Sequence, residues 1–331
     1  MKHGFLITLL VAATLFVGVL ARAESIPEEM IGDWSLDLSS DEAGWISVEL
    51  NEGDPEISMA VDTGSIRPHK NVVIEDGHVS FRLRTSRDGR NGPVLYTDDV
   101  DFWMENGQLI GHVHRVHADG KEAWDHFKGK KLPPMPPAPH LATVKFGEPI
   151  ELFNGKDLTG WELRRPWKKN GWSVQDGVLV NETPKTDFSA TGSFSNLMTE
   201  ELFEDFKLHI EFFIEANRNS GVYLRGMYEA QVVDRDSRMQ GLQGAGSVFG
   251  RVAPSENAGY EGGKWQTYDL TLVDRHITVV LNGIKVVDNE PVRLPTGGAM
   301  HTDPTLPGPI YLQGDHTSVK YRNTVLAPRV K

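Results

Sequence analysis

Prolines near the middle of the chain divide it into two parts. Five of them fall between Lys131 and Pro139 in a chain of 331 residues. Because proline fixes φ and lacks an amide hydrogen, this stretch excludes helix and holds the backbone extended as a semi-rigid spacer. The length also exceeds what one hydrophobic core usually organises. We therefore predict a first domain over residues 24–131, a linker over 132–146 and a second domain over 147–331.

Short runs in which apolar and polar residues alternate occur in both parts, and such alternation predicts half-buried β-strands. The clearest runs of the first part are Trp34–Leu38, Ile46–Leu50, Ile57–Val61 and Val79–Leu83. Those of the second part are Lys207–Ile214, Gly221–Arg225, Glu229–Val233, Gln266–Val273, His276–Leu281 and Pro309–Gln313. Pairs that favour the positive φ angles of tight hairpins separate such runs at Asp76-Gly77, Asn106-Gly107, Asp176-Gly177 and Asn282-Gly283.

This pattern predicts an all-β protein. For the first domain we expect a small antiparallel barrel, lipocalin-like in form, or an open sheet whose sequential strands are joined by tight turns. For the second we expect two packed sheets, because its strands are many and helical stretches are few.

Residues 1–23 have the pattern of an export signal. Lys2 precedes the apolar run Phe5–Leu20, and Ala21 and Ala23 place small residues at the two positions that a signal peptidase reads. The run is shorter than the roughly 20 residues that cross a bilayer, which favours cleavage over a retained anchor. We therefore expect an exported protein, periplasmic or extracellular, with no membrane span after cleavage.

Charge and cysteine content exclude several classes of chemistry. The chain has 34 Lys+Arg against 46 Asp+Glu, a formal net charge of −12, and this acidity disfavours nucleic acid as a partner. It contains no cysteine, which excludes disulfides, thiol nucleophiles and thiolate metal sites. The folding free energy of an exported chain without disulfides must come from burial.

A series of motifs through the second part points to one known family. The motifs are Leu152–Trp161, Trp172–Gly177, Asn219–Gly226, Tyr228–Asp234, Trp265–Tyr268, Leu281–Gly283, Leu312–His316 and Tyr321–Asn323. In this order they resemble the 3-keto-disaccharide hydrolase family, formerly a domain of unknown function, over about residues 147–331. The resemblance implies a concanavalin A-like (lectin/glucanase) jelly-roll β-sandwich. It does not extend to the first domain.

Alternation also places polar and aromatic side chains together on the predicted strands. Three pairs each share one strand face: Tyr223 with Arg225, Glu229 with Gln231, and Tyr311 with Gln313. If these faces are adjacent, they form a groove in which sugar hydroxyls meet polar groups and C–H faces lie on rings. An alternative that the sequence leaves open is an ordinary cross-hairpin ion pair between Arg225 and Glu229.

Three further residues have both a functional and a structural interpretation. Asp234 either binds substrate or caps the end of its strand. Glu211 is either a substrate ligand or a carboxylate on a sheet surface. His316 lies in a loop after a strand, where catalytic groups often sit. In this chain Gly314 and Asp315 lie between Gln313 and His316, where the family often has a shorter Gln–Asp–His run.

The resemblance implies a reaction unlike ordinary glycoside hydrolysis. A retaining glucanase of this fold carries two acids on one strand, in runs such as Glu-x-Asp-x-Glu, and no such run occurs here. A ketone at C3 of a sugar acidifies the hydrogen at C2. A base then removes that hydrogen, the glycosidic oxygen leaves C1 by β-elimination, and water adds afterwards. Glu229 and His316 would act as base and acid, while Arg225 or a divalent cation would stabilise the enolate oxygen.

Nothing in the sequence requires a cofactor. In the first domain His112 and His114 share a strand face, with His117 and His126 nearby. Alternating histidines can chelate a transition metal, but without a defined carboxylate partner a solvated sheet surface is the favoured interpretation.

We therefore expect an exported hydrolase or lyase that cleaves 3-keto-glycosides, with an oligosaccharide or glycoside as its partner. The catalytic candidates are Glu229, His316 and Arg225. The substrate-binding candidates are Tyr223, Gln231, Asp234, Gln313 and Glu211. The first alternative is a non-catalytic, lectin-like carbohydrate-binding protein, and the second is a structural or adhesive role.

Overall fold

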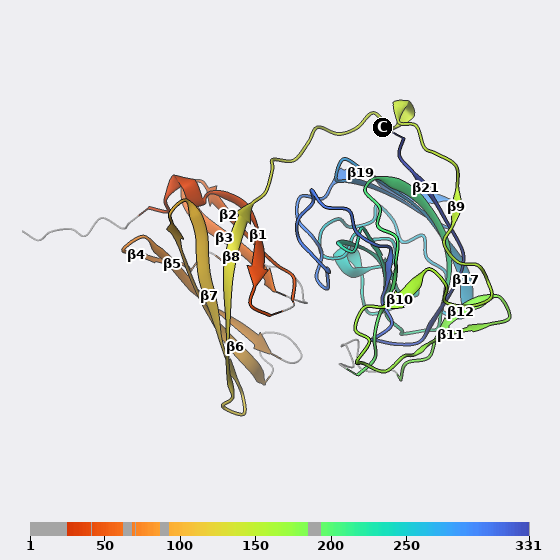
Figure 1. Ribbon diagram of the computed structural model, residues 1–331, viewed down its shortest axis with the longest axis horizontal. Coiled ribbons are helices and arrows are strands. Elements are labelled where there is room, and N and C mark those ends of the chain that lie inside the picture. The colour runs from red at the N-terminus through yellow and green to blue at the C-terminus, as the bar shows by residue number, and fades with distance from the viewer. Residues whose placement is uncertain are drawn as a thin grey trace, which may run out of the picture.

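The computed structural model describes residues 25–40, 42–61, 68–69, 71–86, 93–184 and 193–330. Regular structure in these residues is almost entirely β-strand (Figure 1), which confirms the predicted all-β class. The helical elements are the short 3-10 turns Glu28–Met30, Leu141–Thr143 and Gly241–Gln243. Among the residues described, no helix has the length and apolar character that a membrane crossing needs. The predicted signal segment, residues 1–23, lies outside the described residues.

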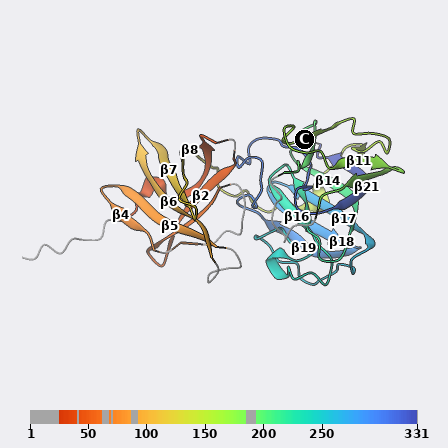
Figure 2. The same cartoon turned by 90° about the horizontal axis from the view of Figure 1, so that it is seen from below.

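Strands β1–β8 form one antiparallel sheet, here called the N-terminal sheet, in the order β3-β2-β1-β8-β7-β6-β5-β4. Their bounds are β1 Gly32–Leu38, β2 Gly44–Asn51, β3 Asp54–Val61, β4 Val73–Glu75, β5 His78–Ser86, β6 Val94–Glu105, β7 Gln108–His117 and β8 Glu122–Lys131. The sheet curls into a half-barrel (Figures 1 and 2), so the open form of the predicted barrel or sheet is the one observed. Phe81, Phe102 and Phe127 lie in the core that covers its buried face.

The predicted hairpin turns have the backbone that their sequences favour. Asp76 and Gly77, between β4 and β5, have φ angles of 51° and 77°. The pairs that begin at Asn106, Asp176 and Asn282 repeat these values closely. Positive φ at both central residues matches the twist of the flanking strands.

The C-terminal part is a sandwich of two antiparallel sheets. The short sheet has the order β10-β13-β20-β15-β16, with bounds Trp161–Leu163, Leu197–Thr199, Tyr311–Leu312, Ser220–Leu224 and Tyr228–Val232. The long sheet has the order β11-β12-β21-β14-β17-β18-β19, with bounds Trp172–Gln175, Val178–Asn181, Val319–Pro328, Phe206–Ile214, Lys264–Val273, His276–Leu281 and Ile284–Pro291. Strand β9, Ile150–Glu151, pairs with β21.

The core between the two sheets decides which side chains the short sheet turns outward. Val222 and Leu312 from the short sheet pack in one cluster with Phe212 and Tyr268 from the long sheet. Since successive side chains of a strand point to opposite faces, the residues on either side of Val222 and Leu312 turn away from this core.

The proline-rich segment runs from the N-terminal sheet to the sandwich (Figure 1), and the sandwich donates hydrogen bonds to several of its carbonyl oxygens. Leu132 packs against Trp45 of the N-terminal sheet and Leu294 of the sandwich. Arg275 donates hydrogen bonds to the carbonyl oxygens of Pro133 and Pro134, at 3.1 Å and 3.4 Å. The linker therefore helps to fix the two parts of the chain to each other.

Candidate functional site

A row of side chains crosses the outer face of the short sheet. In the strand register Glu162 lies opposite Met198, Met198 opposite Tyr311, Tyr311 opposite Tyr223, and Tyr223 opposite Glu229. Directly opposed residues of antiparallel strands point to the same side, so this row faces away from the sandwich core. Tyr311, Tyr223 and Glu229 are buried although they face outward, because loops cover this side of the sheet.

Glu229 is a buried carboxyl group that lies over a glycine of the neighbouring strand. A Cβ atom at Gly221 would lie 2.1 Å from Oε1 of Glu229, so the carboxyl occupies space that only glycine leaves free. Burial raises the pKa of Glu229 to about 8; a hydrogen bond with Tyr223 opposes this rise, and the charge of Asp315 adds to it. The carboxyl is therefore mainly protonated at neutral pH.

Two tyrosines lie beside this carboxyl. The ring centroids of Tyr223 and Tyr311 are 4.5 Å apart, and the Tyr223 hydroxyl donates to the carbonyl oxygen of Gly297 at 2.9 Å. Gly298 has φ +79°, and a Cβ atom there would approach the Tyr223 hydroxyl to 2.6 Å. Burial and the nearby Glu229 raise the pKa of Tyr223 well above its ordinary value, so its hydroxyl remains a hydrogen-bond donor.

Arg164 and Asn196, which the sequence did not single out, complete the surroundings of Tyr311. Arg164 donates to the Tyr311 hydroxyl at 3.2 Å, and the side-chain amide of Asn196 donates to the same oxygen. Burial raises the pKa of Tyr311 to about 12, and the charge of Arg164 opposes that rise. The Tyr311 oxygen thus lies between a cation and an amide.

Asp315 and His316 form a carboxylate–imidazole pair close to Glu229, Tyr223 and Tyr311, here called the site group. Nδ1 of His316 lies 2.7 Å from Oδ1 of Asp315, and both side chains are 15% exposed. Burial favours the neutral form of Asp315, but hydrogen bonds from His316 and Asn196 and the charge of Lys168 outweigh it and lower its pKa. The pair therefore consists of an ionised carboxylate that orients an imidazole.

Asn196 also explains how the lengthened loop before His316 is held. Its Oδ1 accepts the backbone amides of Gly314 and Asp315, at 2.7 Å and 2.9 Å. Asn196 therefore holds both Gly314, the residue by which the run is longer, and Asp315, whose carboxylate orients His316.

Two glutamines share the outer face with Glu229. Nε2 of Gln313 lies 3.5 Å from the Tyr223 hydroxyl, and its Oε1 is buried with no hydrogen-bond partner among the described residues. Gln231 lies opposite Gly221, but its Oε1 accepts the amide of Val232 at 2.9 Å. Gln313 thus offers an acceptor to a bound molecule, whereas the side-chain oxygen of Gln231 is already used.

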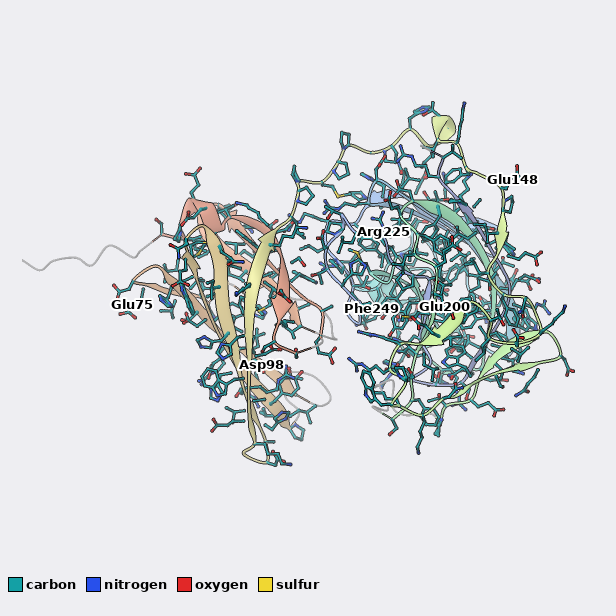
Figure 3. The ribbon with its side chains drawn as sticks, viewed as in Figure 1. Glu75, Asp98, Glu148, Glu200, Arg225 and Phe249 are labelled. Atoms are coloured by element: carbon teal, nitrogen blue, oxygen red, sulfur yellow. The ribbon has the colours of Figure 1, made fainter. Side chains whose placement is uncertain are left out.

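Arg225, which is labelled in Figure 3, does not join Tyr223 and Glu229, and its contacts correct the expectation that it lies beside Glu229. The residue has a φ angle of 55° at the end of β15, so the strand alternation that placed it with Tyr223 no longer applies there. Its guanidinium donates to the carbonyl oxygens of Glu204 and Pro304 and pairs with Asp205 at 3.4 Å. The alternative of a cross-hairpin ion pair with Glu229 is also wrong for the same reason.

Asp234 and Glu211 have structural partners away from this group. The carboxylate of Asp234 accepts the backbone amides of Asn217 and Asp236, at 2.6 Å and 3.1 Å, and so caps the turn after β16. Glu211 lies on β14 of the long sheet, where it binds Arg322 and Asn323. Their structural interpretations are the ones that the geometry favours.

The histidines of the N-terminal sheet lie on a surface shared with an exposed tryptophan. The His114 ring stacks on Trp124 at 4.1 Å and an angle of 9°, while His112 and His126 have ring centroids 5.9 Å apart. Nowhere in the described ranges do three or more His, Asp or Glu side chains gather in a way that would hold a metal ion.

Comparison with known proteins identifies the sandwich. A family model described as "3-keto-alpha-glucoside-1,2-lyase-like domain" matches residues 148–327, more than half of the chain. No curated protein matches.

Solved structures resemble the chain at low sequence identity. Two from Parabacteroides distasonis, each described as a "putative glycosyl hydrolase", are 21% and 22% identical to it, with TM-scores of 0.44 and 0.41. Each match covers 54% of this chain, and 93% and 98% of theirs. A non-specific endo-β-1,3(4)-glucanase of family GH16 is 11% identical over 60% of this chain and 93% of its own, with a TM-score of 0.34.

Proposed function

The chain belongs to the 3-keto-α-glucoside-1,2-lyase-like family, a family of carbohydrate-active domains, and on that premise we propose that it cleaves 3-keto-glycosides. The reaction is elimination across C2 and C1 followed by addition of water. The observation that carries the proposal is a buried, protonated Glu229 in the same group as an ionised Asp315 that orients His316. Such a group supplies an acid and a base at one place, which elimination requires.

His316 is the base in this proposal. Its Nδ1 is held by the Asp315 carboxylate, which fixes the plane of the ring and stabilises the imidazolium formed when the ring takes a proton from C2. The ketone at C3 makes that proton acidic enough for an imidazole to remove.

Glu229 is the acid. A carboxyl group with a pKa of about 8 keeps its proton at neutral pH and can deliver it to the glycosidic oxygen as the bond to C1 breaks. Burial beside Asp315 thus gives Glu229 the role that a solvent-exposed glutamate could not fill at this pH.

The C3 oxygen needs hydrogen-bond donors when enolate charge develops on it. Tyr311 supplies a hydroxyl donor whose raised pKa keeps it protonated, and Arg164 adds a positive charge beside it. Tyr223, whose hydroxyl donates to Gly297, packs against the Tyr311 ring. Fixed donors of this kind stabilise a developing oxyanion without reorganisation of solvent. Arg164 therefore takes the role that the sequence suggested for Arg225.

The proposal also includes one substrate contact and the location of the protein. We assign Oε1 of Gln313 as the acceptor of a hydrogen bond from a sugar hydroxyl. We also place the mature protein outside the cytoplasm, periplasmic or extracellular, as the pattern of residues 1–23 suggests.

The test compares a 3-keto-disaccharide with its unoxidised parent. The full-length protein should release the free sugar from the 3-keto compound and leave the parent disaccharide intact, because only the ketone acidifies C2. Replacing His316 by Gln should abolish release. Cleavage of both sugars at similar rates would refute the elimination mechanism, and binding without cleavage would favour the lectin-like alternative.

A further inference from the structure

The loop that covers Tyr223 and Tyr311 contacts both the candidate site and the N-terminal sheet. The covering segment, residues 296–303, accepts the Tyr223 hydroxyl at Gly297. Its next two carbonyl oxygens, at Gly298 and Ala299, lie 3.4 Å and 3.5 Å from Arg164 nitrogens. Any shift of this segment would therefore move groups that we assign to the C3 oxygen.

The far end of the covering segment is bound by the N-terminal sheet. Thr302, which is 3% exposed, donates to the carbonyl oxygen of Gly44 at 2.6 Å and shares a hydrogen bond with the Ser35 hydroxyl at 2.6 Å. Next to it, Asp303 pairs with Lys130 at 2.5 Å. Strands β1, β2 and β8 or their immediate ends supply these partners, so the sheet holds the segment by two hydrogen bonds and an ion pair.

A second connection reaches the same group from the other side. Glu42, just before β2, pairs with Arg165 at 2.5 Å, and the two side chains are 26% and 24% exposed. The backbone amide of Arg165 donates to Ser195, the neighbour of Asn196. Arg165 is thus next to Arg164 in the chain and binds the residue next to Asn196. Arg164 and Asn196 are the two side chains that bind the Tyr311 hydroxyl.

We propose that the N-terminal sheet is part of the enzyme's active-site support, with Thr302 and Glu42 as positioning residues for the donors Tyr311 and Arg164 and for Tyr223, which packs against Tyr311. This inference rests on the proposed function. It assigns a role to a domain that the family match, residues 148–327, does not cover. The two connections converge on one group of donors, which distinguishes them from contacts that merely join two domains.

Another ion pair across the same interface provides a control. Arg293 binds Glu49 of β2, and also Asp33 at 3.0 Å and the Ser47 hydroxyl at 2.9 Å. The Arg293–Glu49 ion pair is more exposed than that of Glu42 and Arg165, with side chains at 45% and 44%. Glu49→Gln therefore removes an interdomain ion pair without touching the covering segment or the arginine next to Arg164.

The experiment measures kcat and KM on a 3-keto-disaccharide for full-length Thr302→Val, Glu42→Gln and Glu49→Gln proteins. Misplaced donors weaken the stabilisation of a developing charge, so we expect the first two changes to lower kcat at least ten-fold with little change in KM. Glu49→Gln should stay within two-fold of the unmodified protein. Melting temperatures of all three should be similar.

Amide hydrogen exchange gives a readout that does not depend on catalysis. The amides of Thr296 and Met300 donate to the carbonyl oxygens of Met227 and Gly226, at 3.0 Å and 2.7 Å. In Thr302→Val the peptide that carries them should exchange at least ten-fold faster than in Glu49→Gln. If the unmodified protein fails to cleave the sugar, the proposed function fails and exchange alone decides the inference. Unchanged exchange together with unchanged kcat, or equal losses in all three variants, would overturn it.

Discussion

The buried carboxyl of Glu229 predicts a pH dependence of stability that one amide substitution should remove. In the unfolded chain its pKa takes the ordinary value of 4.5, and in the folded protein it is about 8. Between these values the unfolded chain has lost the proton while the folded protein keeps it. The contribution of Glu229 to the free energy of unfolding is therefore fully present below pH 4.5 and declines as the pH rises toward 8.

The size of the effect follows from the two pKa values. Each pH unit between them corresponds to about 1.4 kcal/mol, so the gap predicts a loss of about 5 kcal/mol by pH 8. Glu229→Gln preserves the shape of the protonated carboxyl and does not titrate. The free energy of unfolding of the unmodified protein should therefore fall, relative to that of the variant, by this amount between pH 4.5 and 8.

Urea unfolding of both proteins across this pH range provides the measurement, since all other titrating groups are common to the two and cancel in the difference. Glu211→Gln is the matched control, because its hydrogen bonds to Asn323 and Arg322 outweigh burial and lower the pKa of Glu211. Because Glu211→Gln retains Glu229, the difference in free energy of unfolding between the unmodified protein and this variant should show no such decline. A constant difference between the unmodified protein and Glu229→Gln would refute the conclusion that Glu229 is buried in its neutral form.

Three further predictions concern activity and packing. First, kcat/KM should fall as the pH rises through about 8, because Glu229 must carry its proton; a rise through this pH would make it the base instead. Second, Gly221→Ala should lower kcat at least 100-fold while circular dichroism stays unchanged, because a Cβ atom would displace the Glu229 carboxyl; near-normal turnover would contradict this placement. Third, Arg225→Met should cost about 3 kcal/mol in urea unfolding, since it leaves the carbonyl oxygens of Glu204 and Pro304 without this donor; a change in kcat at unchanged stability would return Arg225 to the site.

Alternation along the strands predicted much of the fold and part of the site. The pairs Asp76-Gly77 and Asn282-Gly283 mark hairpins that the structure contains, because their φ preference is local. Alternation pairs Glu229 with Gln231 on one strand face because period two holds within β16, and the observed register then sets Tyr223 opposite Glu229. That alternation needs only the backbone pattern of the strand itself.

Prediction from the sequence fails where a strand ends and where the partners of a site residue come from distant segments. Arg225 lies one residue beyond β15 in a left-handed conformation, which sequence alternation does not reveal. Arg164 and Asn196 reach Tyr311 from segments 147 and 115 residues away along the chain, and no local pattern marks such contacts. For Asp315 the available signal was the longer run before His316. That run differs from the one usual in the family, but it does not show that Asp315 binds His316.

Solvent deuterium tests the central claim most directly. The unmodified protein, incubated in heavy water with a 3-keto-disaccharide, should place deuterium at C2 of the sugar, as proton NMR would record. Glu229→Gln should keep this exchange while losing cleavage, because the amide removes the acid and leaves His316 in place. Cleavage that proceeds with no label at C2 would contradict the account.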